Sequence, residues 1–286
     1  MKSERGIMQT AIELWQERVQ ARAAQMDAAY TRLGRTSADF WDRRARGFHR
    51  ATRANALSDP FYLYLSERVT PQDSLLDVGA GTGRFSLALA PLVRQVTALE
   101  PSGAMTHYLR ETLEEDGASN ITTLQCRWED APEELRADVV ICCHVLYPLP
   151  EIAPFLIKLH HATQKACYLY LRATHIDTLT APLWRHFHSD ERLMQPGYIH
   201  ALDVLYELGI YARVEVAHAP FALKYPSVRE AEDELIEQLI LEDTPRVRGE
   251  LRAQLENWLS EQTDHTWSSP SQEIVSAILW WPAHEG

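Results

Sequence analysis

The sequence predicts an α/β fold built on a doubly wound, seven-stranded, mostly parallel sheet. From residue 73 onward, short apolar runs typical of buried strands alternate with helical patterns. Strands separated by helices form parallel βαβ units with right-handed crossovers. A second observation is the glycine-rich turn after the first of these runs, which opens a helix and suits a ligand site at the edge of such a sheet. Strands are expected at 74–78, 95–99, 121–125, 137–142, 166–171, 211–217 and 274–280.

Helical patterns fill the gaps between these strands and also precede them. The crossover helices are expected at about 83–92, 103–116, 151–163 and 197–208. Ahead of the sheet, apolar residues from Met8 to Leu33 recur at steps of three and four, which places them on one face of a helix. A short helix over 37–48 and a third over about 60–68 follow this long one.

Two segments go beyond a minimal sheet of this kind. Residues 174–196 are rich in His and aromatic side chains, and 227–262 has the pattern of two amphipathic helices separated at Pro245. We expect residues 1–70 to form an N-terminal helical cap and 71–286 the main domain, with these two segments as helical insertions. The first helix either packs on the body of the protein, forms a homodimer contact or serves as a lid.

Composition limits the partners that the protein is expected to bind. The 286 residues include 28 Lys and Arg against 40 Asp and Glu, a net charge of −12. Since nucleic acids attract basic surfaces, this balance argues against a nucleic-acid partner. No apolar run is long enough to cross a membrane, and residues 1–6 are polar, unlike a signal peptide. The four cysteines form no C-x-x-C pair, so we expect a reduced, cytoplasmic protein without a metal site.

The glycine run is the most informative motif in the chain. After the acid Asp77, glycines stand at Gly79, Gly81 and Gly83, and three glycines this close let the backbone adopt positive φ and approach a ligand. The dinucleotide-binding fingerprint G-x-G-x-x-G requires its last glycine where this chain has Arg84. The spacing G-x-G-x-G after an acid resembles motif I of the class I S-adenosylmethionine-dependent methyltransferases.

This resemblance implies a Rossmann-like methyltransferase fold and S-adenosylmethionine as the cofactor. The loop then faces the methionine and ribose parts of the cofactor, and Asp77 before it and Ala80 inside it are among the expected cofactor-binding residues. Glu100 ends the second expected strand, 17 residues after Gly83, where a carboxylate can accept bonds from both ribose hydroxyls. Pro101 follows it, and Met105 stands where family members place a methionine against adenine.

The resemblance also assigns residues to the other parts of the cofactor. At the end of the third strand, Trp128 is expected against the adenine ring and Glu129 or Asp130 as acceptor of its exocyclic amine. Cys143, at the end of the fourth strand, is expected to run along the cofactor. Trp41 lies in a segment similar to one that closes over the methionine end in such enzymes; a core anchor for the short helix is the other interpretation.

His144 is the best candidate for a catalytic base, because it follows the fourth strand and is expected to face the reacting sulfur. Its alternative is a role in shaping the pocket. Weaker candidates, expected on loops at the same edge, are Tyr147, His175, His186 and His188, while His160 and His161 are expected at the surface. No Asn-Pro-Pro-Tyr-like tetrapeptide follows the fourth strand, so a small-molecule acceptor is favoured. The alternatives are a nicotinamide-dependent oxidoreductase and a non-catalytic cofactor-binding protein of the same fold.

Overall fold

The computed structural model describes residues 9–36, 45, 47, 49 and 56–283. Within them, the predicted seven-stranded sheet is present in the order β3-β2-β1-β4-β5-β10-β6. The first five of these strands run parallel, and β10 pairs antiparallel with both β5 and β6. The strands are β1 (Ser74–Val78), β2 (Gln95–Leu99), β3 (Ile121–Leu124), β4 (Ala137–Cys143), β5 (Thr163–Arg172), β6 (Arg213–Phe221) and β10 (Gln272–Pro282).

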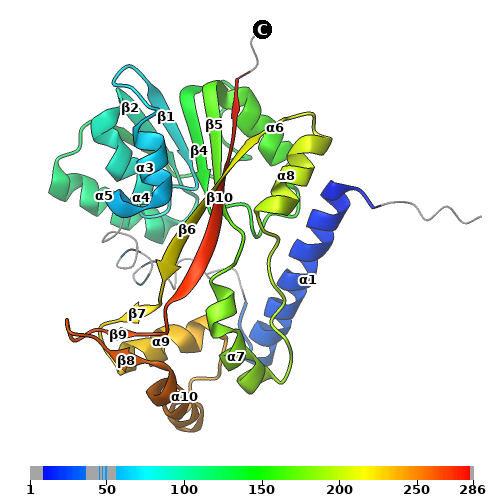
Figure 1. Cartoon of the computed structure of the whole chain (residues 1–286), viewed down its shortest axis with the longest axis vertical. Helices are drawn as coiled ribbons and strands as arrows, with labels where there is room; N and C mark the ends of the chain where they lie inside the picture. The colour runs from blue at the N-terminus through cyan, green and yellow to red at the C-terminus, as the bar shows by residue number, and fades with distance from the viewer. Residues whose placement is uncertain (1–8, 37–44, 46, 48, 50–55, 284–286) are drawn as a thin grey trace, which may run out of the picture.

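The last strands of the sheet are longer than the sequence pattern predicts. β6 begins at Arg213 rather than at residue 211 and continues to Phe221, because it pairs with β10 along its whole length. Both strands extend beyond the rest of the sheet toward a small second sheet (Figure 1). That sheet, which the sequence did not predict, has the order β7-β9-β8 and consists of β7 (Lys224–Tyr225), β8 (Ser260–Glu261) and β9 (Trp267–Ser268).

Helices cover both faces of the main sheet, as the alternation of strands and helices predicts. On one face, Phe61 and Phe85 pack with the β4 residues Val139 and Ile141; on the other, Val140 belongs to the cluster that includes α1, α6 and α8. This alternation follows from the two-residue period of a strand. The helices around the sheet are α1 (Ala11–Arg32), α3 (Pro60–Ser66), α4 (Arg84–Leu89), α5 (Gly103–Asp116), α6 (Ile152–Ala162) and α8 (Tyr198–Glu207), with 3₁₀ turns at Ala56–Ser58 and Ala90–Leu92.

The long first helix packs on the body of the protein. Thr10 caps α1 in a capping box with Glu13, and the Trp15 indole, which is fully buried, donates 2.7 Å to the Leu149 carbonyl. Arg22 forms a buried ion pair with Asp177 at 2.8 Å. On the apolar face that suggested a dimer contact, Trp15, Val19 and Tyr30 are buried against the chain itself, and a homodimer through this helix stays a prediction. No described helix is both long and apolar enough to cross a membrane.

The insertions are helical, and they form a core of their own. They contain α7 (Asp177–His188), α9 (Val228–Gln238) and α10 (Pro245–Trp258). Trp184, Leu235 and Leu251 are fully buried in a cluster that also takes Tyr30 from α1. The division at residue 70 stays a prediction, while α3 lies in the core of the sheet, since its Phe61 stacks on Tyr170 at 5.0 Å between ring centroids.

Candidate functional site

The glycine loop connects β1 to α4 at the carboxyl edge of the sheet. β1 lies between β2 on one side and β4 on the other, so the order of the strands reverses direction at this point. Gly79, Gly81 and Gly83 all have positive φ, at 78°, 58° and 88°. A Cβ added at Gly79 would lie 2.3 Å from Val145 Cγ2, and one at Gly83 would lie 2.4 Å from Leu109 Cδ1. Backbone conformation and close packing therefore both require glycine at these two positions.

Glu100 holds this loop against the end of β2. Its Oε2 accepts a hydrogen bond from the Gly81 amide at 2.9 Å, and its Oε1 accepts one from the Ser102 amide at 2.9 Å. The residue is 9% exposed. Two backbone donors thus fix the orientation of the carboxylate, which can accept about four hydrogen bonds in all. A carboxylate fixed in this way can bind a vicinal diol.

Asp77 lies behind the loop and is buried, with its Oδ2 accepting a hydrogen bond from the Ser86 hydroxyl at 2.6 Å. The pKa of Asp77 is raised to about 7, chiefly by burial; the Ser86 hydrogen bond opposes the shift and the nearby Glu100 carboxylate adds to it. Asp77 therefore supports the loop from within, and its carboxyl group exchanges a proton near neutral pH.

The residues predicted for the adenine end lie in different environments. Met105 is 2% exposed in the first turn of α5, which Ser102 caps, and Pro101 is exposed just before it. Glu129 is exposed after β3, as is Asp130. Trp128 is 3% exposed within the core and donates through its indole nitrogen to the Phe155 carbonyl at 3.3 Å. The interpretation of Trp128 as a base-stacking residue finds no exposed ring face to support it.

His144 follows β4 in a strained conformation, with φ at 60°. Its Nδ1 lies 3.0 Å from Tyr147 Oη, which accepts a hydrogen bond from the Arg172 amide at 2.8 Å. Burial holds the pKa of His144 well below its usual value, and the positive charges of Arg172 and Arg84 lower it further. The imidazole is therefore neutral at physiological pH. A positive φ in a residue other than glycine is often found at a functional site.

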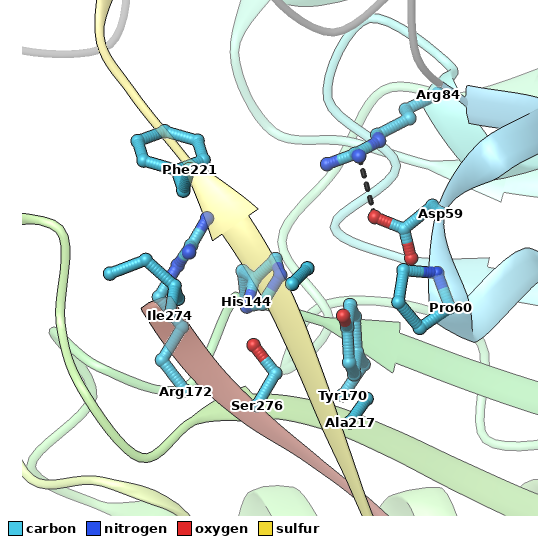
Figure 2. Close-up of a pocket in the computed structure, with 11 residues that line it drawn as sticks. Asp59, Pro60, Arg84, His144, Tyr170, Arg172, Ala217, Phe221, Ile274 and Ser276 are labelled. Atoms are coloured by element: carbon cyan, nitrogen blue, oxygen red, sulfur yellow. Dashed lines mark hydrogen bonds and ion pairs between the residues drawn. The ribbon is translucent and has the colours of Figure 1, made fainter. Parts of the chain in front are cut away.

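His144 lines a pocket that we call the arginine pocket, which encloses about 70 Å³. Arg84 pairs with Asp59 there at 2.6 Å, and the Arg172 side chain extends from the end of β5 toward Phe221 (Figure 2). The residues that matter for its chemistry are Asp59, Arg84, His144, Tyr170, Arg172 and Phe221. Apart from His144, the sequence did not single out any of them for this role. The signal that could have found Arg172 is its place at the carboxyl end of a parallel strand.

Of the other histidines expected near this edge, His175 lies beside Tyr147, whereas His186 and His188 contact the inserted helices. The His175 ring contacts the Tyr147 ring at 5.3 Å. His186 and His188 were expected on a loop, but they lie in the last turn of α7, bonded to Glu250 and to the Leu239 carbonyl. That expectation was wrong because 177–188 is helical and docks on the inserted helices.

Three further residues were singled out from the sequence. Cys143 ends β4 half-buried, and burial raises the pKa of its thiol well above the usual value. Trp41 lies outside the described residues, so the structure does not test its place over the methionine end. His160 was expected at the surface, but it is half-buried and accepts a hydrogen bond from the Trp281 indole at 3.1 Å.

Comparison with known proteins identifies the central region. A family model described as a methyltransferase domain matches residues 75–166. An uncharacterized protein of Haemophilus influenzae is 28% identical over 156 residues, which make up 51% of this chain and 54% of that protein. The 23S rRNA (uracil(1939)-C(5))-methyltransferase RlmD of Burkholderia pseudomallei is 39% identical over 67 residues, 23% of this chain and 14% of that enzyme. The chain thus spans about half or less of the length of these curated relatives.

A solved structure extends the likeness from the central region to the fold. The YcgJ protein of Bacillus subtilis aligns with 81% of this chain and 99% of its own, at a TM-score of 0.53 and 13% identity. The family model, over residues 75–166, includes β1 from Leu75 onward, the glycine loop, Glu100 and His144. Residues 75–166 thus match a methyltransferase domain, and the chain shares the fold of the YcgJ protein.

Proposed function

We propose that this protein transfers a methyl group from S-adenosylmethionine to a small-molecule acceptor. The observation that carries the proposal is the fixed Glu100 carboxylate, which two backbone amides hold at the end of β2 beside a loop of positive-φ glycines. This arrangement suits the two ribose hydroxyls of a nucleoside cofactor. The four described cysteines are free thiols, which fits a reducing compartment such as the cytoplasm.

In this proposal the cofactor lies across the carboxyl edge of β1, β2 and β4. Glu100 binds the ribose, the glycine loop lets the ligand approach the backbone, and Met105 and Glu129 or Asp130 flank the adenine. Cys143 lies beside the sulfonium end and Trp41 over the methionine end. When bound, S-adenosylmethionine supplies a methyl group already activated by a positively charged sulfur. The chain itself supplies orientation, exclusion of water and, where the acceptor needs it, a base.

His144 is the proposed base for an acceptor that must lose a proton. With Nδ1–H donating to Tyr147 Oη, the Nε2 lone pair is available to the acceptor. The new bond forms between the methyl carbon and the acceptor atom while the sulfur–methyl bond breaks, with its electron pair left on sulfur. The acceptor proton then passes to Nε2. Because the pKa of His144 is low, it can deprotonate only a group that is already acidic or becomes so as the bond forms.

The family match favours methyl transfer over the nicotinamide-dependent oxidoreductase, and Arg84 stands where the dinucleotide fingerprint needs glycine. A nucleic-acid acceptor, such as the relative RlmD has by its name, is less favoured here. The net charge of −12 gives no general attraction to phosphate backbones.

Calorimetric titration with S-adenosylhomocysteine tests the cofactor assignment. Wild-type protein is expected to bind it, and Glu100→Gln is expected to weaken binding by at least about 100-fold. Each charge-assisted hydrogen bond to a ribose hydroxyl is worth about 1.5–3 kcal/mol, and about 1.4 kcal/mol corresponds to a factor of ten. Glu215→Gln on the exposed face of β6 is the matched control and should bind like wild type.

Methyl transfer itself is measured with methyl-labelled S-adenosylmethionine and a low-mass metabolite extract. Label is expected in a small molecule, and Glu100→Gln is expected to abolish the signal at low cofactor concentration. If folded Glu100→Gln protein binds S-adenosylhomocysteine with wild-type affinity, the assignment of Glu100 to the cofactor ribose is contradicted. Cofactor binding without label in any small molecule would favour the non-catalytic alternative.

A further inference from the structure

The arginine pocket holds more positive charge than its described lining residues neutralise. Its charged residues are Arg84, Arg172 and Asp59. The pair of Arg84 with Asp59, at 2.6 Å, balances one positive charge. His144 is neutral because burial lowers its pKa, and burial raises the pKa of the Tyr170 phenol to about 12. Among the described residues that line the pocket, one guanidinium is therefore left without a counter-ion.

That guanidinium belongs to Arg172. Within the described part of the chain, no hydrogen bond or ion pair involves its side-chain nitrogens, and its one ring contact is with Phe221, at 5.5 Å. Arg172 is half-buried, and this burial lowers the pKa of its guanidinium. A partly buried charge without a partner is unfavourable, so its retention calls for a ligand that supplies the partner.

Arg84 adds a second donor without an acceptor. Its terminal nitrogen bonds to Asp59, but its Nε is buried and has no hydrogen-bond partner among the described residues. The Asp59 carboxylate is already used, because Oδ2 accepts from Arg84 and Oδ1 accepts from the Phe61 amide at the start of α3. The pocket thus has an excess of N–H donors as well as an excess of positive charge.

The size and charge of the pocket favour one class of anion. A single excess positive charge is neutralised by a monoanion, whereas a phosphate monoester would carry up to two negative charges. A planar carboxylate also matches the fork of a guanidinium in a bidentate arrangement. A space of about 70 Å³ suits a group of a few atoms.

Resting on the proposed function, we propose that the methyl acceptor is a small carboxylate-bearing molecule whose carboxylate is bound by Arg172, beside the Arg84–Asp59 pair. β4 and β5 are adjacent, with Cys143 opposite Tyr170, so His144 and Arg172 follow neighbouring strand ends and line one pocket. An acceptor held at Arg172 is therefore presented to His144. The carboxylate is the recognition group, because a guanidinium that withdraws its electron density makes it a poor nucleophile.

Thermal melting with simple anions tests the pocket without knowledge of the acceptor. Acetate, propionate and benzoate at 50 mM are compared with their uncharged amides and with inorganic phosphate, all at one ionic strength. At least one carboxylate is expected to raise the melting temperature by about 2 °C over its amide. Arg172→Met should remove the difference, and the control Arg213→Met, on exposed β6, should retain it. Equal shifts for acids and amides, or a larger shift with phosphate, would overturn the proposal.

Methyl transfer provides the second test. A metabolite extract is divided on an anion-exchange resin, and each fraction is incubated with methyl-labelled S-adenosylmethionine. Label is expected in the retained fraction, in a product stable to base, because a methyl ester would place the methyl group on the carboxylate itself. Arg172→Met is expected to lower kcat/KM by about 100-fold, mostly through KM, with unchanged affinity for S-adenosylhomocysteine.

These outcomes separate the two proposals. Absence of S-adenosylhomocysteine binding, together with absence of label in every fraction, contradicts methyl transfer. Binding of S-adenosylhomocysteine with label in the unretained fraction, or in a base-labile ester, leaves methyl transfer intact and overturns the role of Arg172. Arg172→Lys retains the charge without the planar fork, so it should recover part of the lost kcat/KM. If folded Arg172→Lys protein has the same kcat/KM as Arg172→Met, recognition of the acceptor by the charge of Arg172 is contradicted.

Discussion

Replacing Asp77 by asparagine is expected to stabilise the protein, and to do so increasingly as the pH rises. The Asp77 side chain is buried behind the glycine loop, and burial raises its pKa from 3.8 to about 7. Between these values the folded protein holds the proton more tightly than the unfolded chain does. The contribution of Asp77 to stability is therefore fully present below pH 3.8 and is lost as the pH rises toward and through 7.

The magnitude follows from the shift in pKa. Each pKa unit corresponds to about 1.4 kcal/mol, so the free energy of unfolding falls by about 4 kcal/mol as Asp77 ionises between pH 3.8 and pH 7. About 2.5 kcal/mol of this loss falls between pH 5 and pH 8. Asparagine has the same shape, and its side-chain oxygen can accept the hydrogen bond from Ser86, but it carries no charge. The stability gained by Asp77→Asn should therefore grow by about 2.5 kcal/mol over this range.

Urea unfolding of wild type and Asp77→Asn at several values from pH 5 to pH 8 measures this difference. Asp138→Asn is the matched control, because hydrogen bonds from Ser74 hold the pKa of Asp138 below its usual value. The contribution of Asp138 is lost only as the pH falls through its folded pKa, so the effect of that substitution should be constant from pH 5 to pH 8. A pH-independent difference between wild type and Asp77→Asn would refute the reasoning.

Four further predictions address the site. Gly83→Ala is expected to cost about 1–3 kcal/mol in urea unfolding, because alanine must adopt φ of 88° and its Cβ meets Leu109; unchanged stability would contradict this. His144→Gln should lower kcat by about 10²–10⁴-fold without changing S-adenosylhomocysteine affinity if His144 is the base, and a normal kcat would leave it a pocket residue. If Glu129 accepts the adenine amine, wild type should bind the inosine form of the product several-fold more weakly, and Glu129→Gln should reduce that discrimination; equal binding of both forms by wild type would exclude an amine acceptor. Trp41→Phe should weaken cofactor binding with little change in melting temperature if Trp41 covers the methionine end, whereas lost stability with unchanged affinity would make it a core anchor.

The sequence by itself determined the sheet and the edge of the sheet at which the glycine loop lies. The period of apolar residues and the glycine spacing are local properties, and they were enough to predict seven strands and the helices between them. Glu100 was expected at the same edge as the glycine loop, because parallel strands joined by a helix end at the same edge; the structure adds its hydrogen bond with the Gly81 amide. Such relations depend on residues close in sequence or on general rules of chain connection.

Only the tertiary structure decided which side chains meet in the arginine pocket. Asp59, Arg84, His144 and Arg172 come from four separate elements, and whether a side chain at a strand end faces the site depends on register and on the strands beside it. Trp128 shows the same dependence, because packing against Phe155 in the core, rather than its place after a strand, determines its exposure. Burial and charge pairing arise from contacts between distant residues, and no local pattern in the chain records them.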